Sequence, residues 1–212
     1  MSPPQVLCAL CGVNEATTRD HVPPRAIFPK PRPALVTVPA CLPCNLKGSK
    51  HDEAFRVYLS LHVGIDSEAS SSLFTDGALR TLSHNQRLRD VIVGGARKVR
   101  VMTPAGIYAG TATGVLWDSK AHDAVIERTL RGLYYHHYEG ILGGRAKIKV
   151  QWIRSIPNDI ATVMKDSPLV RIGDGQFSYR RVIAADQPLS TIWLFSFYDR
   201  HLASGYTLPA EG

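Results

Sequence analysis

The four cysteines of this chain form two identical pairs, and their spacing constrains the fold more than any other feature. Cys8 and Cys11 are the first CxxC pair, and Cys41 and Cys44 are the second, with 29 residues between the pairs. Two pairs at this spacing are typical of a tetrahedral zinc site with four thiolate ligands. The first ten residues lack the basic and apolar segments of a secretion signal. We therefore expect a cytoplasmic protein with reduced thiols and no membrane association.

The distribution of proline along the chain also favours a zinc site. Nine of the 14 prolines lie within the first 43 residues, where they prevent long helices. This segment also has too few large apolar residues to form a core alone, so a bound metal would supply the missing stability. A redox role for Cys41-Leu-Pro-Cys44 is the alternative, but the βαβ pattern that surrounds a thioredoxin-like motif is absent from the sequence.

Local patterns divide the chain into two parts. The β-branched run 36–40 predicts a strand, and Pro43 predicts a helical turn that Gly48 ends. A capping box at 49–52 predicts a second helix over 52–62. The small and polar segment 64–72 predicts a linker. We therefore expect a module over 1–63, a linker over 64–72 and a second domain over 73–212.

The second domain is predicted to be α+β. Its helical periodicity is strongest over 121–142, and a shorter amphipathic helix is expected over 73–91. Alternation of polar and apolar residues predicts an antiparallel sheet. The expected strands are 98–102, 107–117, 146–153, 176–184 and 190–198.

Polar motifs surround the cysteine pairs. Arg19-Asp20-His21-Val22-Pro23 lies between the pairs, and Asn45-Leu46-Lys47-Gly48-Ser49 follows the second pair directly. In this order and spacing the first quarter of the chain resembles the HNH endonuclease family. The resemblance implies a small zinc-stapled ββα-metal module, with an Asp-His pair on a strand and an Asn on the following helix.

The resemblance also implies a mechanism of phosphodiester hydrolysis. His21 would be the general base, since a neutral imidazole can take a proton from an attacking water near pH 7. Asp20 and Asn45 would hold Mg²⁺ or Mn²⁺, which prefer oxygen ligands. The four cysteines would hold structural zinc and leave no open coordination position. One position departs from the pattern, because many HNH proteins have an Asn where this chain has Val36. Either another group braces that loop or activity is reduced or lost.

Charge favours a polyanionic partner. The formal net charge is +7 and the pI is near 9.4, which favours nucleic acid over a basic protein. Arg19, Arg25, Lys47 and Lys50 flank the motif and are candidate phosphate contacts. We expect DNA as substrate, with RNA, a protein partner and a homodimer left open. The alternatives are a non-catalytic zinc module that binds nucleic acid or protein, and a nuclease subunit of a bacterial defence complex that a partner activates.

Two further features have two interpretations each. His51 is a second candidate for base or ligand, although its position favours a role in the cap of the helix expected over 52–62. The aromatic run 133–138 could stack on bases, but its helical stripe favours packing against the core.

Overall fold

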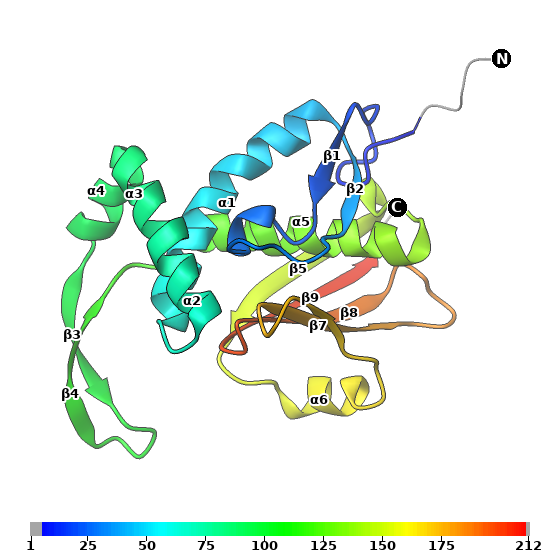
Figure 1. Ribbon diagram of the computed structural model, residues 1–212. Coiled ribbons are helices and arrows are strands. Elements are labelled where there is room, and N and C mark those ends of the chain that lie inside the picture. The colour runs from blue at the N-terminus through cyan, green and yellow to red at the C-terminus, as the bar shows by residue number, and fades with distance from the viewer. Residues whose placement is uncertain (1–5, 211–212) are drawn as a thin grey trace.

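Helix α5, Ser119–Tyr138, runs through the middle of the molecule (Figure 1). The structure is a computed structural model that describes residues 6–210, so residues 1–5 of the predicted module and residues 211–212 lie outside it. The N-terminal elements lie on one side of α5, and a five-stranded antiparallel sheet lies on the other. The fold is therefore a mixture of helices and antiparallel sheets, as expected. None of the helices over 6–210 has the length and apolar character needed to span a membrane.

The N-terminal elements are a short hairpin and a long helix. Strands β1, Thr18–His21, and β2, Thr37–Ala40, pair antiparallel, with His21 opposite Thr37. Their connection contains the 3₁₀ turn η1, Arg25–Ile27. Helix α1, Leu42–Val63, begins directly after β2 because Pro43 suits the first turn of a helix.

Helix α1 is continuous, so the predicted break at Gly48 and the capping box at 49–52 are wrong. Gly48 is buried within the helix, where a Cβ would lie 1.5 Å from an amino nitrogen of Arg128 on α5. The glycine is therefore required by a close approach between two helices and not by a helix end. Tertiary packing outweighs the low helix propensity of glycine at this position.

The segment after α1 contains more helix than expected. Helix α2, Glu68–Ser72, leads into a π-helix, η2, Leu73–Leu79, and then into α3, Arg80–His84. Helix α4, Gln86–Gly94, is separate because the Asn85 side chain accepts a hydrogen bond from the Leu88 amide at 3.0 Å and caps a new helix. The single helix expected over 73–91 is therefore divided at Asn85.

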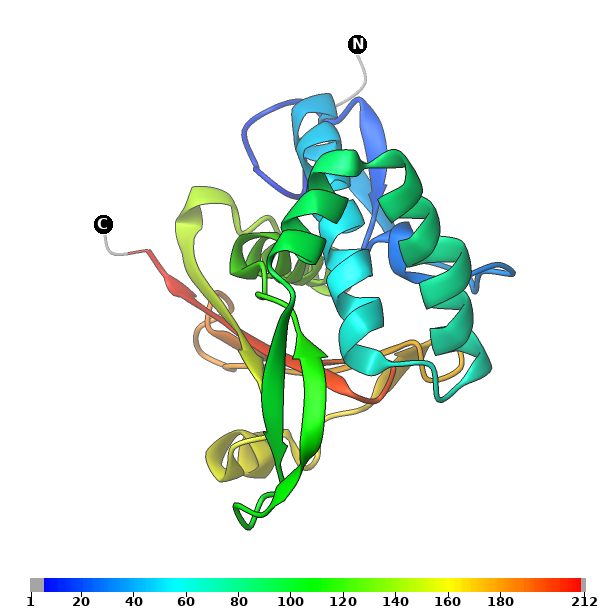
Figure 2. The same cartoon turned by 90° about the vertical axis from the view of Figure 1, so that its left-hand side faces the viewer.

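A two-stranded arm follows these helices. Strands β3, Arg97–Met102, and β4, Tyr108–Gly114, pair antiparallel and extend away from the rest of the molecule (Figure 2). Every residue of β3 is exposed. Both strands lie close to their predicted positions, but they form a sheet of their own.

The main sheet has the strand order β5-β9-β8-β7-β6, with all neighbours antiparallel. The 3₁₀ turn η3, Gly143–Arg145, precedes it, and helix α6, Asn158–Met164, lies on the face opposite α5 (Figure 1). Local sequence patterns did not predict β6, β9 or α6. For β9 the reason is that it has small residues such as Ala203 and Gly205 where alternation would require large apolar ones. The strands are β5, Ala146–Ile153; β6, Val170–Ile172; β7, Phe177–Ile183; β8, Thr191–Phe197; and β9, His201–Pro209.

One cluster of buried side chains joins the N-terminal elements to α5 and the sheet. Phe55 of α1 meets the edge of Phe197 of β8 at a centroid distance of 5.4 Å. Val22, which follows β1, packs where a Cβ on Gly132 of α5 would lie, only 2.4 Å away. The division into 1–63 and 73–212 stays a prediction about folding units, while the packing between them is continuous.

Candidate metal centre and active site

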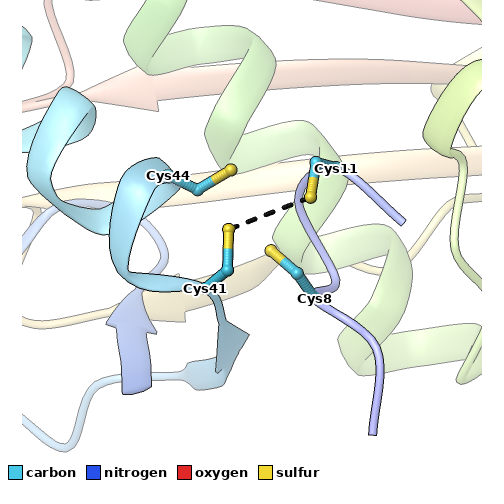
Figure 3. A group of neighbouring side chains, drawn as sticks. All are labelled: Cys8, Cys11, Cys41 and Cys44. Atoms are coloured by element: carbon cyan, nitrogen blue, oxygen red, sulfur yellow. Dashed lines mark hydrogen bonds between the residues drawn. The ribbon is translucent and has the colours of Figure 1, made fainter. Parts of the chain in front are cut away.

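The four cysteines converge on one point. Their Sγ atoms all lie within 4.8 Å of one another, and the Sγ atoms of Cys11 and Cys41 are 3.9 Å apart. The first pair comes from the loop before β1, and the second comes from the start of α1 (Figure 3). Zinc bonds of about 2.3 Å in a tetrahedron separate the sulfurs by about 3.8 Å. The cluster could therefore hold a metal ion such as zinc.

Hydrogen bonds around the cluster stabilise the thiolate forms of Cys11 and Cys41. Burial acts to raise the pKa of Cys11, but amide hydrogen bonds, chiefly from Asn14, outweigh it and lower the pKa to about 7. The pKa of Cys41 is lowered in the same way, and the Asn14 side-chain amide lies 3.7 Å from its Sγ. Burial raises the pKa of Cys8 and Cys44. Metal binding would therefore release protons from the thiols of Cys8 and Cys44.

Asp20 lies on the buried side of β1 and faces α5. Its Oδ1 accepts the His21 amide at 2.8 Å, and its Oδ2 lies 3.5 Å from Nε of Arg128. Arg128 also forms an ion pair and a hydrogen bond with Asp52 of α1. Burial raises the pKa of Asp20 and brings the pKa of Asp52 to about 6, although Arg128 acts to lower both. One guanidinium therefore lies between the buried carboxyl group of Asp20 and the partly buried one of Asp52, behind the hairpin.

His21 is the last residue of β1, and strand alternation directs it to the side opposite Asp20. Its side chain is half-buried. Burial and the neighbouring charge of Arg25 lower its pKa, although Asp20 acts to raise it. A lowered pKa keeps the imidazole neutral at pH 7, in the state that accepts a proton.

Asn45 connects the first turn of α1 to β1. Its side-chain Nδ2 donates to Thr18 Oγ1 and to the carbonyl of Arg19, both at 3.2 Å. Within the part of the chain that the structure describes, its Oδ1 has no hydrogen-bond donor. The structure therefore places Asn45 against the strand that carries the Asp-His pair, with its amide oxygen available to a ligand.

The basic residues of the motif face solvent. The guanidinium of Arg19 donates to Thr37 Oγ1 at 2.8 Å and to the Thr37 carbonyl at 3.0 Å, across the hairpin. Arg25, Lys47 and Lys50 are exposed. Their contact with phosphates stays a prediction, and Arg19 has a structural role as well.

The loop between β1 and β2 is braced from the main sheet. The carbonyl of Val36 accepts the Val22 amide at 3.0 Å, and its side chain packs against the core. The hydroxyl of Tyr198, in the turn between β8 and β9, donates to the carbonyl of Ile27 at 2.6 Å. A residue far along the chain thus holds the loop in which the family resemblance would place an Asn.

Sequence reasoning missed Arg128, Asp52 and Tyr198 as parts of this region. Arg128 and Tyr198 reach the hairpin and its loop, and Asp52 pairs with Arg128, through tertiary contacts that no local pattern encodes. Gly48 was the available signal, because a glycine inside an otherwise helical run can mark the close approach of another group.

The two ambiguous features are also placed by the structure. His51 lies within continuous α1 and caps no helix, and burial lowers its pKa. The aromatic run packs largely inward, as expected. Tyr134 is buried and donates to the Pro188 carbonyl at 3.1 Å, and a ring nitrogen of His137 lies 2.7 Å from the Tyr179 hydroxyl.

Comparisons with protein-family models, curated proteins and solved structures gave no match to this chain.

Proposed function

We propose that this chain is a metal-dependent endonuclease of the HNH type that hydrolyses phosphodiester bonds, with DNA as substrate. The observation that carries the proposal is the contact between Asn45 and β1 next to a four-cysteine cluster. It joins a hairpin that ends in a half-buried neutral histidine to a helix that offers an amide oxygen. This is the arrangement expected of a ββα-metal nuclease site.

The residues present suit a hard divalent cation in part. Asp20 Oδ2 is buried and has no hydrogen-bond donor in the described chain, and the oxygen of Asn45 is similarly available. Carboxylate and amide oxygens are ligands that Mg²⁺ and Mn²⁺ accept. Asp20 and Asn45 would hold the ion, which would neutralise charge on the scissile phosphate and the leaving oxygen.

His21 would act as the general base. Its neutral imidazole would take a proton from a water molecule as the water oxygen attacks phosphorus. The exposed cations Arg25 and Lys47 would orient the phosphate backbone. Zinc at the four cysteines would fix the separation of β1 and α1 and take no part in the chemistry.

A non-catalytic zinc module that binds nucleic acid is the second candidate, and Arg128 favours it. The guanidinium already supplies positive charge 3.5 Å from Asp20 Oδ2. A carboxylate with a permanent cationic partner has less need of a divalent ion. In this case the hairpin would bind phosphates without cutting them.

A cleavage assay distinguishes the two candidates. Supercoiled DNA, linear DNA and RNA are incubated with the purified protein and Mg²⁺ or Mn²⁺, with zinc content measured for every sample. We expect cutting by the wild type and a loss of about 100-fold or more in His21→Ala. His136→Ala, at an exposed histidine of α5, is the matched control and should cut normally. Equal cutting rates for both variants would remove His21 as the general base, whereas binding without any cutting by the wild type would favour the non-catalytic module.

A further inference from the structure

A large cavity lies beside the hairpin, between the loop after η1, helix α1 and the helices η2 and α3. Its volume is about 880 Å³. It is much larger than a phosphate group and of a size that holds a nucleotide unit. Its walls come from segments that are far apart in the sequence, so only the folded chain forms it.

Cations dominate the walls of this cavity. Lys30 and Arg32 come from the loop, Arg56 from α1 and Arg80 from α3, and Glu53 and Asp76 are the acidic residues of the lining. Four cations against two carboxylates leave a formal charge of +2.

The carboxylates of the cavity offset these cations only in part: the charge of Glu53, together with that of nearby Asp52, acts to raise the pKa of Arg56. Glu53 accepts from the Asn85 side-chain amide at 3.1 Å, and Asp76 accepts from the Thr75 hydroxyl at 3.4 Å. Over the described residues 6–210, none of the four cations lies within ion-pair distance of a carboxylate. The positive charges of the lining are therefore only partly offset, and no carboxylate of the described residues forms an ion pair with them.

Arg56 is the central group of the four. It is half-buried, and its guanidinium donates to the Thr81 hydroxyl, a neutral acceptor. A Cβ on Gly77 would lie 3.1 Å from its Cδ, so the glycine leaves room for the arginine stem. Gly77 belongs to the π-helix η2, a type of helix that concentrates at functional sites. Burial lowers the pKa of Arg56, the charges of Glu53 and Asp52 act to raise it, and those of Arg32 and Arg80 act to lower it.

We propose that this cavity binds a phosphate group of a nucleic-acid strand through Arg32, Arg56 and Arg80. Guanidinium groups recognise phosphate oxygens with paired hydrogen bonds, and a phosphate would supply the missing negative charge. The inference rests on the proposed function in one respect, namely that the strand held here leads to His21. Arg32 connects the two regions, because it lines the cavity and its charge also lowers the pKa of His21.

Binding without added divalent ion tests the inference apart from cleavage. The probes are a 12-nucleotide single strand and a 12-base-pair duplex, each labelled at a 3′ end and prepared with a 5′-phosphate or a 5′-hydroxyl. Fluorescence anisotropy is measured over a range of KCl concentrations. Arg32→Gln/Arg80→Gln is the test variant, since both side chains are exposed and their loss should leave the melting temperature unchanged. Lys149→Gln/Arg171→Gln removes two exposed charges from the main sheet and is the matched control.

We expect the test variant to bind about 10-fold or more weakly than the control variant. The slope of log K against log[KCl] should fall by about 1 to 2, in line with two lost phosphate contacts. Preference for the 5′-phosphate would identify a terminal monoester in the cavity, and equal binding of both ends would identify an internal diester; either result supports the proposal. Equal affinity and slope in the two double variants would overturn it.

The outcomes also separate this inference from the proposed function. If the wild type binds through the cavity but never cuts, the phosphate site in the cavity is supported and the proposed nuclease function is wrong. If the wild type cuts, and the Arg32→Gln/Arg80→Gln variant binds and cuts like the control variant, the nuclease function is supported and the phosphate site in the cavity is wrong.

Discussion

Replacing Arg128 by methionine should destabilise the protein by about 3–5 kcal/mol, because it removes the cation between the buried carboxyl group of Asp20 and the partly buried one of Asp52. Arg128 is 8% exposed and forms ion pairs with Asp20 and Asp52. At the 3.5 Å separation of Nε and Asp20 Oδ2, the Coulomb attraction is about 5 kcal/mol for an effective dielectric constant of 20. Desolvation offsets this attraction in the wild type, but the variant keeps both acids and loses their partner.

The assay is urea unfolding at pH 7.5, followed by tryptophan fluorescence, on protein with verified zinc content. Arg131→Met is the control, since Arg131 lies one turn further along α5 and pairs with Glu127, whose side chain is 42% exposed. We expect it to cost about 1 kcal/mol or less. Adding Asp52→Asn to Arg128→Met should recover part of the loss, because a neutral amide needs no cation.

The same reasoning predicts how the stability of Arg128→Met changes with pH. Without Arg128 the pKa of Asp52, already about 6, should rise further. An acid with a raised pKa in the folded state loses stability as the pH rises through that pKa. The deficit of Arg128→Met relative to the wild type should therefore be largest above pH 7 and smaller at pH 5. Equal stability of Arg128→Met and Arg131→Met, or a deficit that grows toward pH 5, would refute this account.

Three further results are expected. Cys41→Ser should lose zinc and melt at lower temperature; one zinc per chain with normal melting, by elemental analysis and calorimetry, would contradict the four-thiolate site. His201 is fully buried, and burial lowers its pKa to about 3. As the pH falls, His201 is therefore protonated in the unfolded chain before it is protonated in the folded one. This difference should lower the free energy of unfolding by about 2 kcal/mol between pH 6.5 and pH 5. His201→Gln should reduce that pH slope in urea unfolding, and an unchanged slope would exclude His201 as its source. Amides of β3 and β4 should exchange hydrogen much faster than those of β8, since an isolated hairpin is marginally stable; equal protection by mass spectrometry would indicate that a partner covers the arm.

Much of the architecture could be predicted from local patterns. The helix α5 and the strands β5, β7 and β8 follow from periodicity, because large apolar residues recur at the spacing of each element. Strand β9 could not be found in this way, since it lies between β5 and β8, where neighbouring strands and α5 cover its small residues. Local patterns also did not indicate that α1 continues through Gly48. The group that requires a glycine at this position is Arg128, which lies 80 residues further along the chain.

The sequence by itself predicted the four-cysteine cluster from ligand spacing and the strand at 36–40 from its β-branched residues, while the hairpin that this strand completes was implied by the family resemblance. The tertiary structure alone decided what surrounds Asp20 and which cations line the neighbouring cavity. Those groups come from α1, α3, α5 and the loop after η1. Their electrostatic interactions depend on distances through space, and a linear pattern of residues does not contain those distances.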